Sequence, residues 1–203
     1  MPEADRGKRG RDERRGELLL AARQVFASKG YHAATVDDIT RAAGVAKGTF
    51  YLYFDEKRAV FYELIRAFFE LVTEIGKAVA GEVQDRAEYV RKLEVAVARI
   101  CELFRDHRDL VKLVYRESMG MDPELESMVR EFYRRIARLE AENVRRGISL
   151  GLFRDDLHPL VVAYAQIGMV ERVLLAQLSD RSFPAEVDLV KQIVGLALRG
   201  AER

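Results

Sequence analysis

The stretch Thr35–Lys57, TVDDITRAAGVAKGTFYLYFDEK, predicts two short helices joined by a tight turn. Thr35 is a good N-cap, because its hydroxyl can accept a hydrogen bond from an otherwise unpaired backbone N–H, and Asp38 completes a capping box. Gly44 lies where the first helix should end, since glycine adopts the left-handed conformation without a Cβ clash. A second helix follows from Lys47 after a short gap. Helix, glycine turn and helix is the layout of a DNA-reading helix-turn-helix.

The second predicted helix, 47–54, has a composition that core packing alone does not explain. Phe50 and Phe54 are four residues apart and can anchor it inward. The other positions supply hydroxyls, an ammonium group and a glycine that allows close backbone approach, which suits a surface that meets phosphates and base edges. These positions are Lys47, Gly48, Thr49, Tyr51 and Tyr53. A helical hairpin that only packs is the alternative.

The segment Leu18–Leu64 resembles the N-terminal domain of the TetR family of bacterial transcriptional regulators. The resemblance rests on an apolar first helix ending in F-x-x-x-G, then T-x-x-x-I-x-x-x-A-G-V, then K-G-T-x-Y-x-x-F, and a lysine that opens the next helix. These pieces are Phe26–Gly30, Thr35–Val45, Lys47–Phe54 and Lys57. One position departs from the pattern: Ala46 stands where the family often has a capping serine.

The resemblance implies how these residues meet DNA. The Lys47–Phe54 helix would enter the major groove, and we expect Thr49 and Tyr51 near base edges. Tyr53 and Thr35 would lie on phosphates. In the family, a lysine at the position of Lys57 contacts a phosphate together with the helix N-terminus, whose amides favour an anion.

The two ends of the chain differ in charge. The net charge of the whole chain is only +1, but residues 1–58 carry twelve Lys and Arg against nine Asp and Glu, and the remainder carries twenty-two against twenty-four. We expect residues 1–16, MPEADRGKRGRDERRG, to be a disordered basic arm, because they are polar and charged and include glycine. The arm is either a solvated tail or a contact to the phosphate backbone or the minor groove.

Apolar residues at helical spacing predict an all-α fold of about nine helices. We expect helices at 17–29, 35–43, 47–54, 57–81, 87–105, 109–118, 122–147, 158–178 and 184–199. This gives a helix-turn-helix domain at 17–56, with its reading motif at 35–54, and a ligand-binding and dimerisation domain at 57–203. The lone cysteine, Cys101, is expected to be a buried, inert thiol rather than a redox sensor. With no signal-peptide pattern and no run of eighteen apolar residues, we expect a cytoplasmic protein without a membrane partner.

The predicted helix 158–178 is apolar almost all round. From Leu160 to Val170 only Gln166 is strongly polar, whereas a helix with one core face has one polar face. One side can pack on its own domain, and a second copy of the chain can cover the other. We therefore expect a homodimer through 158–178 and 184–199, which the family resemblance also implies. A fully internal helix in a monomer is the alternative.

Apolar side chains in the second domain can line a ligand cavity, although such residues also simply fill a core. The residues predicted for an effector site are Phe68, Phe104, Met119, Tyr133 and Tyr164. The family resemblance implies a small-molecule pocket whose occupation releases DNA. The segments ESMGMDPELESMVREFY and GISLGLFRDDLHP resemble those of regulators of fatty-acid metabolism, so an acyl-CoA or an aromatic compound is the predicted effector class.

Two other classes of function fit the sequence less well. An enzyme is disfavoured because His32, His107 and His158 lack metal-ligand partners at helical spacing, and nucleophile-elbow, P-loop and dinucleotide motifs are absent from the sequence; we expect neither a cofactor nor a metal. A protein-binding adaptor would have no reason to expose the hydroxyls and the ammonium of 47–53. The sequence therefore predicts a ligand-responsive homodimeric regulator, a repressor, that binds an inverted repeat in double-stranded DNA.

Overall fold

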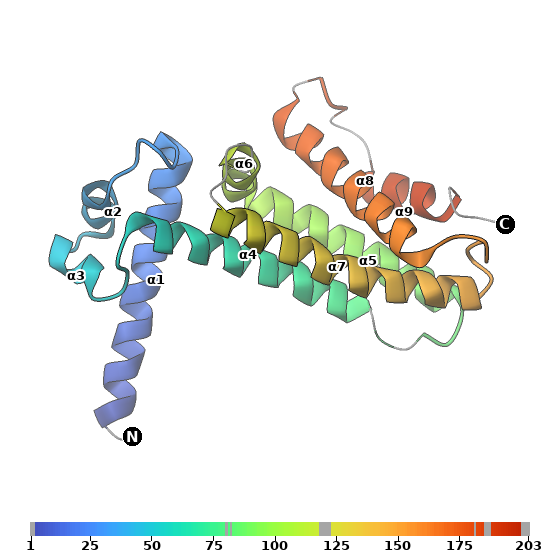
Figure 1. The fold of residues 1–203 in the computed structure, drawn as a ribbon, viewed down its shortest axis with the longest axis horizontal. Coiled ribbons are helices and arrows are strands. Elements are labelled where there is room, and N and C mark those ends of the chain that lie inside the picture. Colours follow the sequence, from blue (N-terminus) through green and yellow to red (C-terminus); the bar gives the residue numbers. More distant parts are fainter. Residues whose placement is uncertain are drawn as a thin grey trace. The chain divides into compact units, whose positions relative to one another are not determined.

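The computed structural model describes residues 3–79, 81, 83–117, 123–180, 182–184 and 188–199, and all of its regular elements are helices (Figure 1). The helices are α1 (Glu3–Lys29), α2 (Val36–Ala43), α3 (Lys47–Tyr51), α4 (Lys57–Val79), α5 (Arg86–Asp106), α6 (Arg108–Glu117), α7 (Pro123–Ser149), α8 (Pro159–Ser179) and α9 (Leu189–Arg199). The predicted all-α fold is confirmed.

The chain forms two compact units. Unit 1 contains α1, α2, α3, the first part of α4 as far as Phe68, and α6; unit 2 contains the rest of α4 together with α5, α7, α8 and α9. The sequence placed a domain boundary at 56/57, near the start of α4. The division between the two compact units at 68/69 lies inside α4, and the first turns of this helix contact α1 and the α1–α2 connection.

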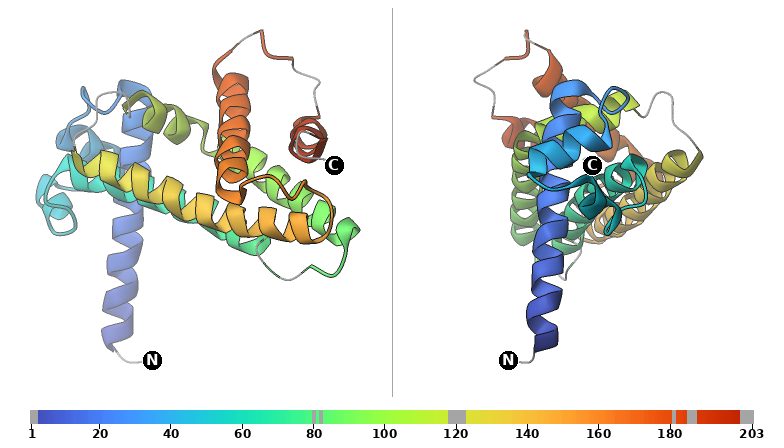
Figure 2. Two further views of the ribbon diagram at one scale, coloured as in Figure 1. Left: turned by 45° about the vertical axis from the view of Figure 1, so that its right-hand side comes forward. Right: turned by 90° about the vertical axis from the view of Figure 1, so that its left-hand side faces the viewer.

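Unit 1 is built around an aromatic cluster that joins α1 to α4. Phe26 and Phe61 are both almost fully buried, with ring centroids 5.8 Å apart in an edge-to-face pair. Tyr31, just after α1, stacks on Phe61 at 4.4 Å. The helix α2 packs against both α1 and α3, as Figures 1 and 2 show, with Ile39 fully buried. Edge-to-face and offset-stacked rings are the favoured arrangements of aromatic pairs, so this cluster packs the end of α1 against the second turn of α4.

Unit 2 is a helical bundle in which the second part of α4 runs beside α7 (Figure 2). Phe69 of α4 stacks on Phe132 of α7 with ring centroids 3.9 Å apart, and Glu70 pairs with Arg135 at 2.9 Å. The helix α8 packs against α7, α5 and α9. Its inward face joins an apolar cluster centred on Leu174 and Ile193, against which half-buried Cys101 packs. Burial raises the pKa of this thiol, in agreement with the predicted inert cysteine.

Three helix boundaries differ from the prediction. The first helix begins at Glu3 and not at Glu17, so the structure gives the described part of the expected disordered arm a helical backbone. The last helix begins at Leu189 and not at Pro184, because Asp188 caps it by accepting a hydrogen bond from the Lys191 N–H at 3.0 Å. The helix expected at 47–54 is α-helical only to Tyr51 and continues as a turn to Phe54.

Candidate DNA-reading surface and effector unit

The start of α2 is held by the predicted capping box. The Asp38 N–H donates to Thr35 Oγ1 at 3.1 Å, and the Thr35 N–H donates to Asp38 Oδ2 at the same distance. Lys29 at the end of α1 donates to Asp38 Oδ1 at 2.6 Å. The hydrogen bond from Lys29, and then that from Thr35, lower the pKa of Asp38 to about 2. Thr35 is exposed at the helix N-terminus, where a phosphate would be favoured, but its hydroxyl already serves Asp38.

The turn between α2 and α3 contains one left-handed glycine, and one exposed ion pair lies beside it. Gly44 ends α2 with φ +66°, in the left-handed region that a Cβ disfavours. Ala46 precedes α3 and, as an alanine, offers no polar side-chain cap. Lys47 instead pairs with Asp37 of α2 at 2.9 Å, and this hydrogen bond raises the pKa of Lys47. The pair connects the two helices where the family's serine is missing.

The side chains of α3 divide between an anchored face and an open face. Phe50 is fully buried and Phe54 is 4% exposed, as predicted. Tyr51 is 50% exposed, and Lys47 and Gly48 are also open to solvent. Thr49 and Tyr53 are half-buried at the edges of this face. The surface therefore presents an ammonium, hydroxyls and an aromatic ring together, which can meet phosphates and base edges.

Sequence reasoning missed one residue of this surface. Leu52 is 72% exposed, the largest exposure among the exposed large apolar side chains of the described chain. It follows Tyr51 at the end of α3. Its outward direction could have been predicted from the sequence, because it lies midway between Phe50 and Phe54, which both face inward. An apolar side chain on a reading helix can contact a thymine methyl group.

Lys57 does not extend freely from the first turn of α4. Its Nζ donates to the carbonyl oxygens of Tyr31 at 2.7 Å, His32 at 3.3 Å and Ala34 at 2.7 Å. It also lies 4.5 Å from the centroid of the Tyr31 ring. In this structure without DNA the Lys57 ammonium group thus contacts backbone acceptors of unit 1, and its phosphate contact stays a prediction.

The five residues predicted to line an effector cavity have different surroundings. Phe68 is buried at the end of the unit 1 part of α4, and Phe104 packs in the α5–α8–α9 cluster. Tyr133 donates from its hydroxyl to Glu171 Oε1 at 2.7 Å, whereas Tyr164 is 45% exposed on α8. Met119 lies outside the described residues. Phe104, Tyr133 and Tyr164 all belong to unit 2, and their role as lining of a cavity stays a prediction.

Unit 2 nevertheless contains polar groups inside its apolar bundle. Burial raises the pKa of Glu140, which accepts a hydrogen bond from the Asn143 side chain at 3.2 Å, and Arg146 donates to Asn143 Oδ1 at 3.1 Å. The Tyr89 hydroxyl donates to the Asn143 carbonyl at 3.2 Å. On α8, the buried Oε1 of Gln166 has no hydrogen-bond donor in the described part of the chain. Such an acceptor is costly in an apolar interior unless a bound molecule or water supplies a donor.

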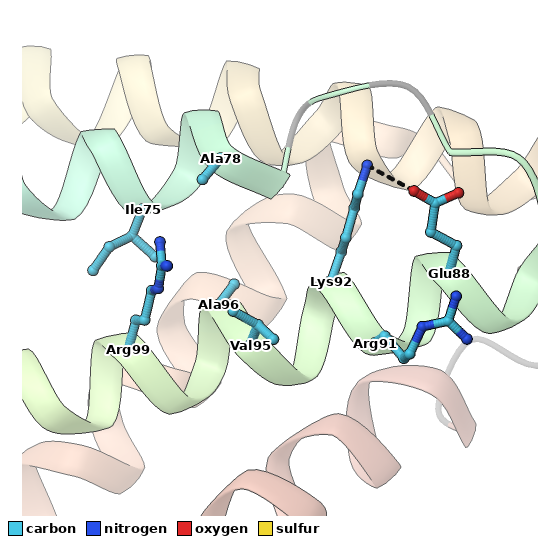
Figure 3. A pocket seen from close by; sticks show the side chains of 8 residues that line it. All are labelled: Ile75, Ala78, Glu88, Arg91, Lys92, Val95, Ala96 and Arg99. Atoms are coloured by element: carbon cyan, nitrogen blue, oxygen red, sulfur yellow. Dashed lines mark ion pairs between the residues drawn. The ribbon is translucent and has the colours of Figure 1, made fainter.

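A shallow groove runs between the end of α4 and α5 (Figure 3). Its floor is apolar, with Ile75 and Ala96, and basic side chains stand along it. Lys92 pairs with Glu88 at 3.2 Å, as Figure 3 shows. The volume of this groove is about 170 Å³, below the ~300–1,000 Å³ of small-molecule sites. It is therefore a surface groove rather than the predicted effector pocket.

The helix α8 presents an apolar stripe to the outside of unit 2. Val161 is 67% exposed and Tyr164 is 45% exposed, and Ala165 and Gly168 continue the stripe at helical spacing. On the neighbouring α9, Leu196 is also exposed. In the described chain α8 alone is long and apolar enough to span a membrane by length and composition, with mean hydropathy 1.4 and 17% of that window buried. The stripe needs a cover that a single copy of the chain does not supply in the described structure.

Two protein-family models match the chain. The model for bacterial regulatory proteins of the tetR family matches residues 18–64, which contain α2, α3 and the first turns of α4. The model for a tetracyclin repressor-like C-terminal domain matches residues 86–175, from α5 into α8. Both units of the structure therefore contain a matched segment.

Individual relatives agree with these models along most of the chain. The HTH-type transcriptional regulator YdgC of Bacillus subtilis is 31% identical over 193 residues, covering 93% of this chain and 92% of the relative. The HTH-type transcriptional repressor KstR2 of Rhodococcus jostii is 34% identical over 157 residues, covering 73% and 72%. Among solved structures, the fatty acid degradation regulator FadR from Bacillus halodurans superposes with a TM-score of 0.74 at 26% identity, covering 91% of this chain and 94% of that one.

Proposed function

Because the chain belongs to the tetR family of bacterial regulatory proteins, DNA-binding transcriptional regulators that are not enzymes, we propose that it is a homodimeric repressor released from an inverted repeat by an apolar small molecule. The observation that carries the DNA-reading part is the open face of α3. Phe50 and Phe54 hold this helix from within, and Lys47, Thr49, Tyr51 and Leu52 are left to face a duplex.

Each contact on DNA has a proposed chemistry. Three side chains meet base edges in the major groove, those of Thr49, Tyr51 and Leu52. Gly48 lets the α3 backbone approach the bases. Lys47 and Tyr53 contact phosphates, with the exposed N-terminus of α2 at Thr35. To reach a phosphate, Lys47 exchanges its exposed pair with Asp37, which costs little because both side chains are more than half exposed.

The dimer is supported by the exposed stripe of α8. Its small residues, Ala165 and Gly168, allow a second helix to approach closely, and Val161 and Tyr164 supply apolar area to bury. A lipid cover fits the same helix poorly, because half-buried Glu171 lies within it and accepts a hydrogen bond from Tyr133 of α7. A second copy, with α9 beside α8, covers the stripe and places two α3 helices on one duplex. The half-sites then lie about 34–36 Å apart. A regulator of this kind acts on chromosomal DNA in the cytoplasm.

The effector is proposed to be an acyl-CoA or an aromatic compound that enters unit 2. The likeness to a fatty acid degradation regulator supports an acyl group, and the likeness to the repressor KstR2 supports repression as the mode of regulation. Within unit 2, the aromatic side chains of α4 and α7 and the unpaired Gln166 acceptor offer an apolar site with a polar contact. Phe104, Tyr133 and Tyr164 remain the proposed lining in unit 2, and exposed Tyr164 also suits the dimer face. Of the other two predicted residues, Phe68 belongs to unit 1 and Met119 lies outside the described residues.

The test is selection of genomic fragments by the purified protein at about 0.2 M salt, which suppresses purely electrostatic binding. Recovery of one palindromic site is expected. Tyr51→Ala should then lose operator affinity while Tyr115→Ala, at a similarly exposed tyrosine on α6, should not. If the two variants bind equally, the assignment of α3 is wrong. If no site is recovered, mass spectrometry of the same sample separates a protein purified with its effector from one that does not read DNA.

A further inference from the structure

The ammonium group of Lys57 forms hydrogen bonds to backbone carbonyl oxygens within unit 1. Its three hydrogens face three carbonyl oxygens, those of Tyr31, His32 and Ala34, at 2.7, 3.3 and 2.7 Å. These carbonyls belong to the connection between α1, which ends at Lys29, and α2, which begins at Val36. Backbone acceptors outside helices require donors from elsewhere, and charged donors give the stronger hydrogen bonds. Lys57 thus holds the α1–α2 connection from the first turn of α4.

A second cation holds the other end of the reading motif. Arg15 of α1 forms an ion pair with Glu63 in the second turn of α4. The same guanidinium lies over the ring of Phe54, 4.9 Å from its centroid. Phe54 ends the segment that follows α3, so Arg15 connects α1, the end of the reading helix and α4. A guanidinium can pair with a carboxylate and stack on a ring at once, because its charge is planar and delocalised.

The two cations act at opposite ends of the helix-turn-helix. Lys57 holds the connection that leads into α2, and Arg15 holds the turn that leaves α3. Both use the first two turns of α4 as their support, through Lys57 itself and through Glu63. A displacement of these turns is therefore transferred to both ends of the reading motif together.

We propose that Lys57 and Arg15 are positioning residues that couple α4 to the reading helices, and that Lys57 is not a phosphate contact. This inference rests on the proposed DNA-reading function. For Lys57 to reach a phosphate, three hydrogen bonds to the backbone must break, and the connection into α2 loses its support. The anion-binding capacity at the start of α4 belongs to its backbone N–H groups instead.

The test compares Lys57→Met with Lys47→Met, a matched loss of one lysine in the same unit. Affinity for the selected operator and for unrelated DNA is measured across a salt series. Lys47→Met should reduce the salt slope by about 0.9 and weaken both DNAs similarly, as loss of a phosphate contact does. Lys57→Met should keep the wild-type slope and affinity for unrelated DNA but lose at least tenfold on the operator. A slope lowered by about one, with equal loss on both DNAs, overturns the proposal.

Lys57→Arg separates the two roles without removing the charge. A phosphate contact tolerates arginine, so that role predicts near wild-type binding. A planar guanidinium cannot direct three hydrogens from one nitrogen onto three carbonyls, so positioning predicts a lower operator preference with an unchanged slope. Wild-type operator preference in Lys57→Arg would contradict positioning by Lys57.

Amide hydrogen exchange tests the coupling without DNA. In full-length Lys57→Met, residues 34–41 should exchange faster than in the wild type, and in Lys47→Met their protection should change less. Arg15→Met should loosen residues 50–54 in the same way. If fragment selection fails on wild-type protein that mass spectrometry shows to be free of effector, while these changes appear, the DNA-reading function is wrong and the coupling stands. Unchanged exchange in both segments refutes the coupling itself.

Discussion

Replacing Gly147 with alanine tests the packing at the end of α7. Gly147 is buried, and an added Cβ would lie 2.6 Å from both Cδ2 and Cε2 of Phe153 and 3.2 Å from the Tyr89 hydroxyl. Phe153 is 1% exposed and forms an edge-to-face pair with Tyr89, so its ring has no free space to move into. Overpacking of this kind costs about 1–3 kcal/mol. Alanine recovers up to ~1 kcal/mol of helix propensity, so a net loss of about 1 kcal/mol is expected for Gly147→Ala.

Gly76→Ala is the matched control, because Gly76 lies in the last turn of α4 as Gly147 lies in the last turn of α7. Its added Cβ would meet Leu139 Cδ1 at 3.6 Å, an ordinary contact, so the variant should gain up to ~1 kcal/mol. The two variants should then differ by about 4–8 °C in Tm, since 1 kcal/mol shifts Tm by roughly 2–4 °C at this size. Calorimetry at one protein concentration measures the difference, because the proposed dimer would make Tm concentration-dependent. Equal stability, or a more stable Gly147→Ala, would refute the packing of Phe153 on α7.

Three further predictions follow from the reading motif and from α8. Thr35→Ala removes the cap of α2 and should lower the free energy of unfolding by about 1 kcal/mol, measured by urea titration; a change within error would show that the capping box is dispensable. The pKa of Asp38 is lowered from 3.8 to about 2, so the stabilisation of the fold by its carboxylate is complete above about pH 4 and is lost as the pH falls towards 2. Asp38→Asn should therefore flatten the plot of unfolding free energy against pH over that window. An unchanged plot would contradict the Lys29 contact. Val161→Glu should convert the dimer to monomers in sedimentation experiments, whereas Gln177→Glu, elsewhere on the exposed surface of α8, should leave it intact; a dimeric Val161→Glu would place the interface elsewhere.

Local signals in the sequence predicted the reading motif well. The capping box of Thr35 and Asp38 and the left-handed Gly44 depend on residues within three or four positions of each other, so the sequence contains all the partners. The inward direction of Phe50 and Phe54 follows in the same way from their spacing. These features required no knowledge of the rest of the chain.

Boundaries that depend on distant partners were predicted less well. The segment before Glu17 was expected to be disordered from its charge, yet Arg15 contacts Phe54 and Glu63, far along the chain. The start of the last helix was predicted from Pro184, but the Asp188 side chain caps it further on. A sequence shows which residues can cap or pair, but several candidates compete, and tertiary contacts decide between them.

The effector residues show a different limit of sequence reasoning. Aromatic and methionine side chains suit both a filled core and a ligand cavity, and their spacing is the same in both. Tyr133 proved to be bonded to Glu171, and Tyr164 lies on the exposed stripe of α8. The buried Gln166 acceptor was noted in the sequence only as a polar interruption of an apolar helix. That this oxygen is buried without a hydrogen-bond donor can be seen only in the three-dimensional structure.

A rod-like helix transmits a displacement only if it is attached at both ends, and α4 has specific attachments in each unit. In unit 1, Lys57 and Glu63 bind it to the two ends of the reading motif. In unit 2, Phe69 stacks on Phe132 and Glu70 pairs with Arg135, which attaches it to α7. Each unit therefore holds its own part of α4 through specific side-chain contacts.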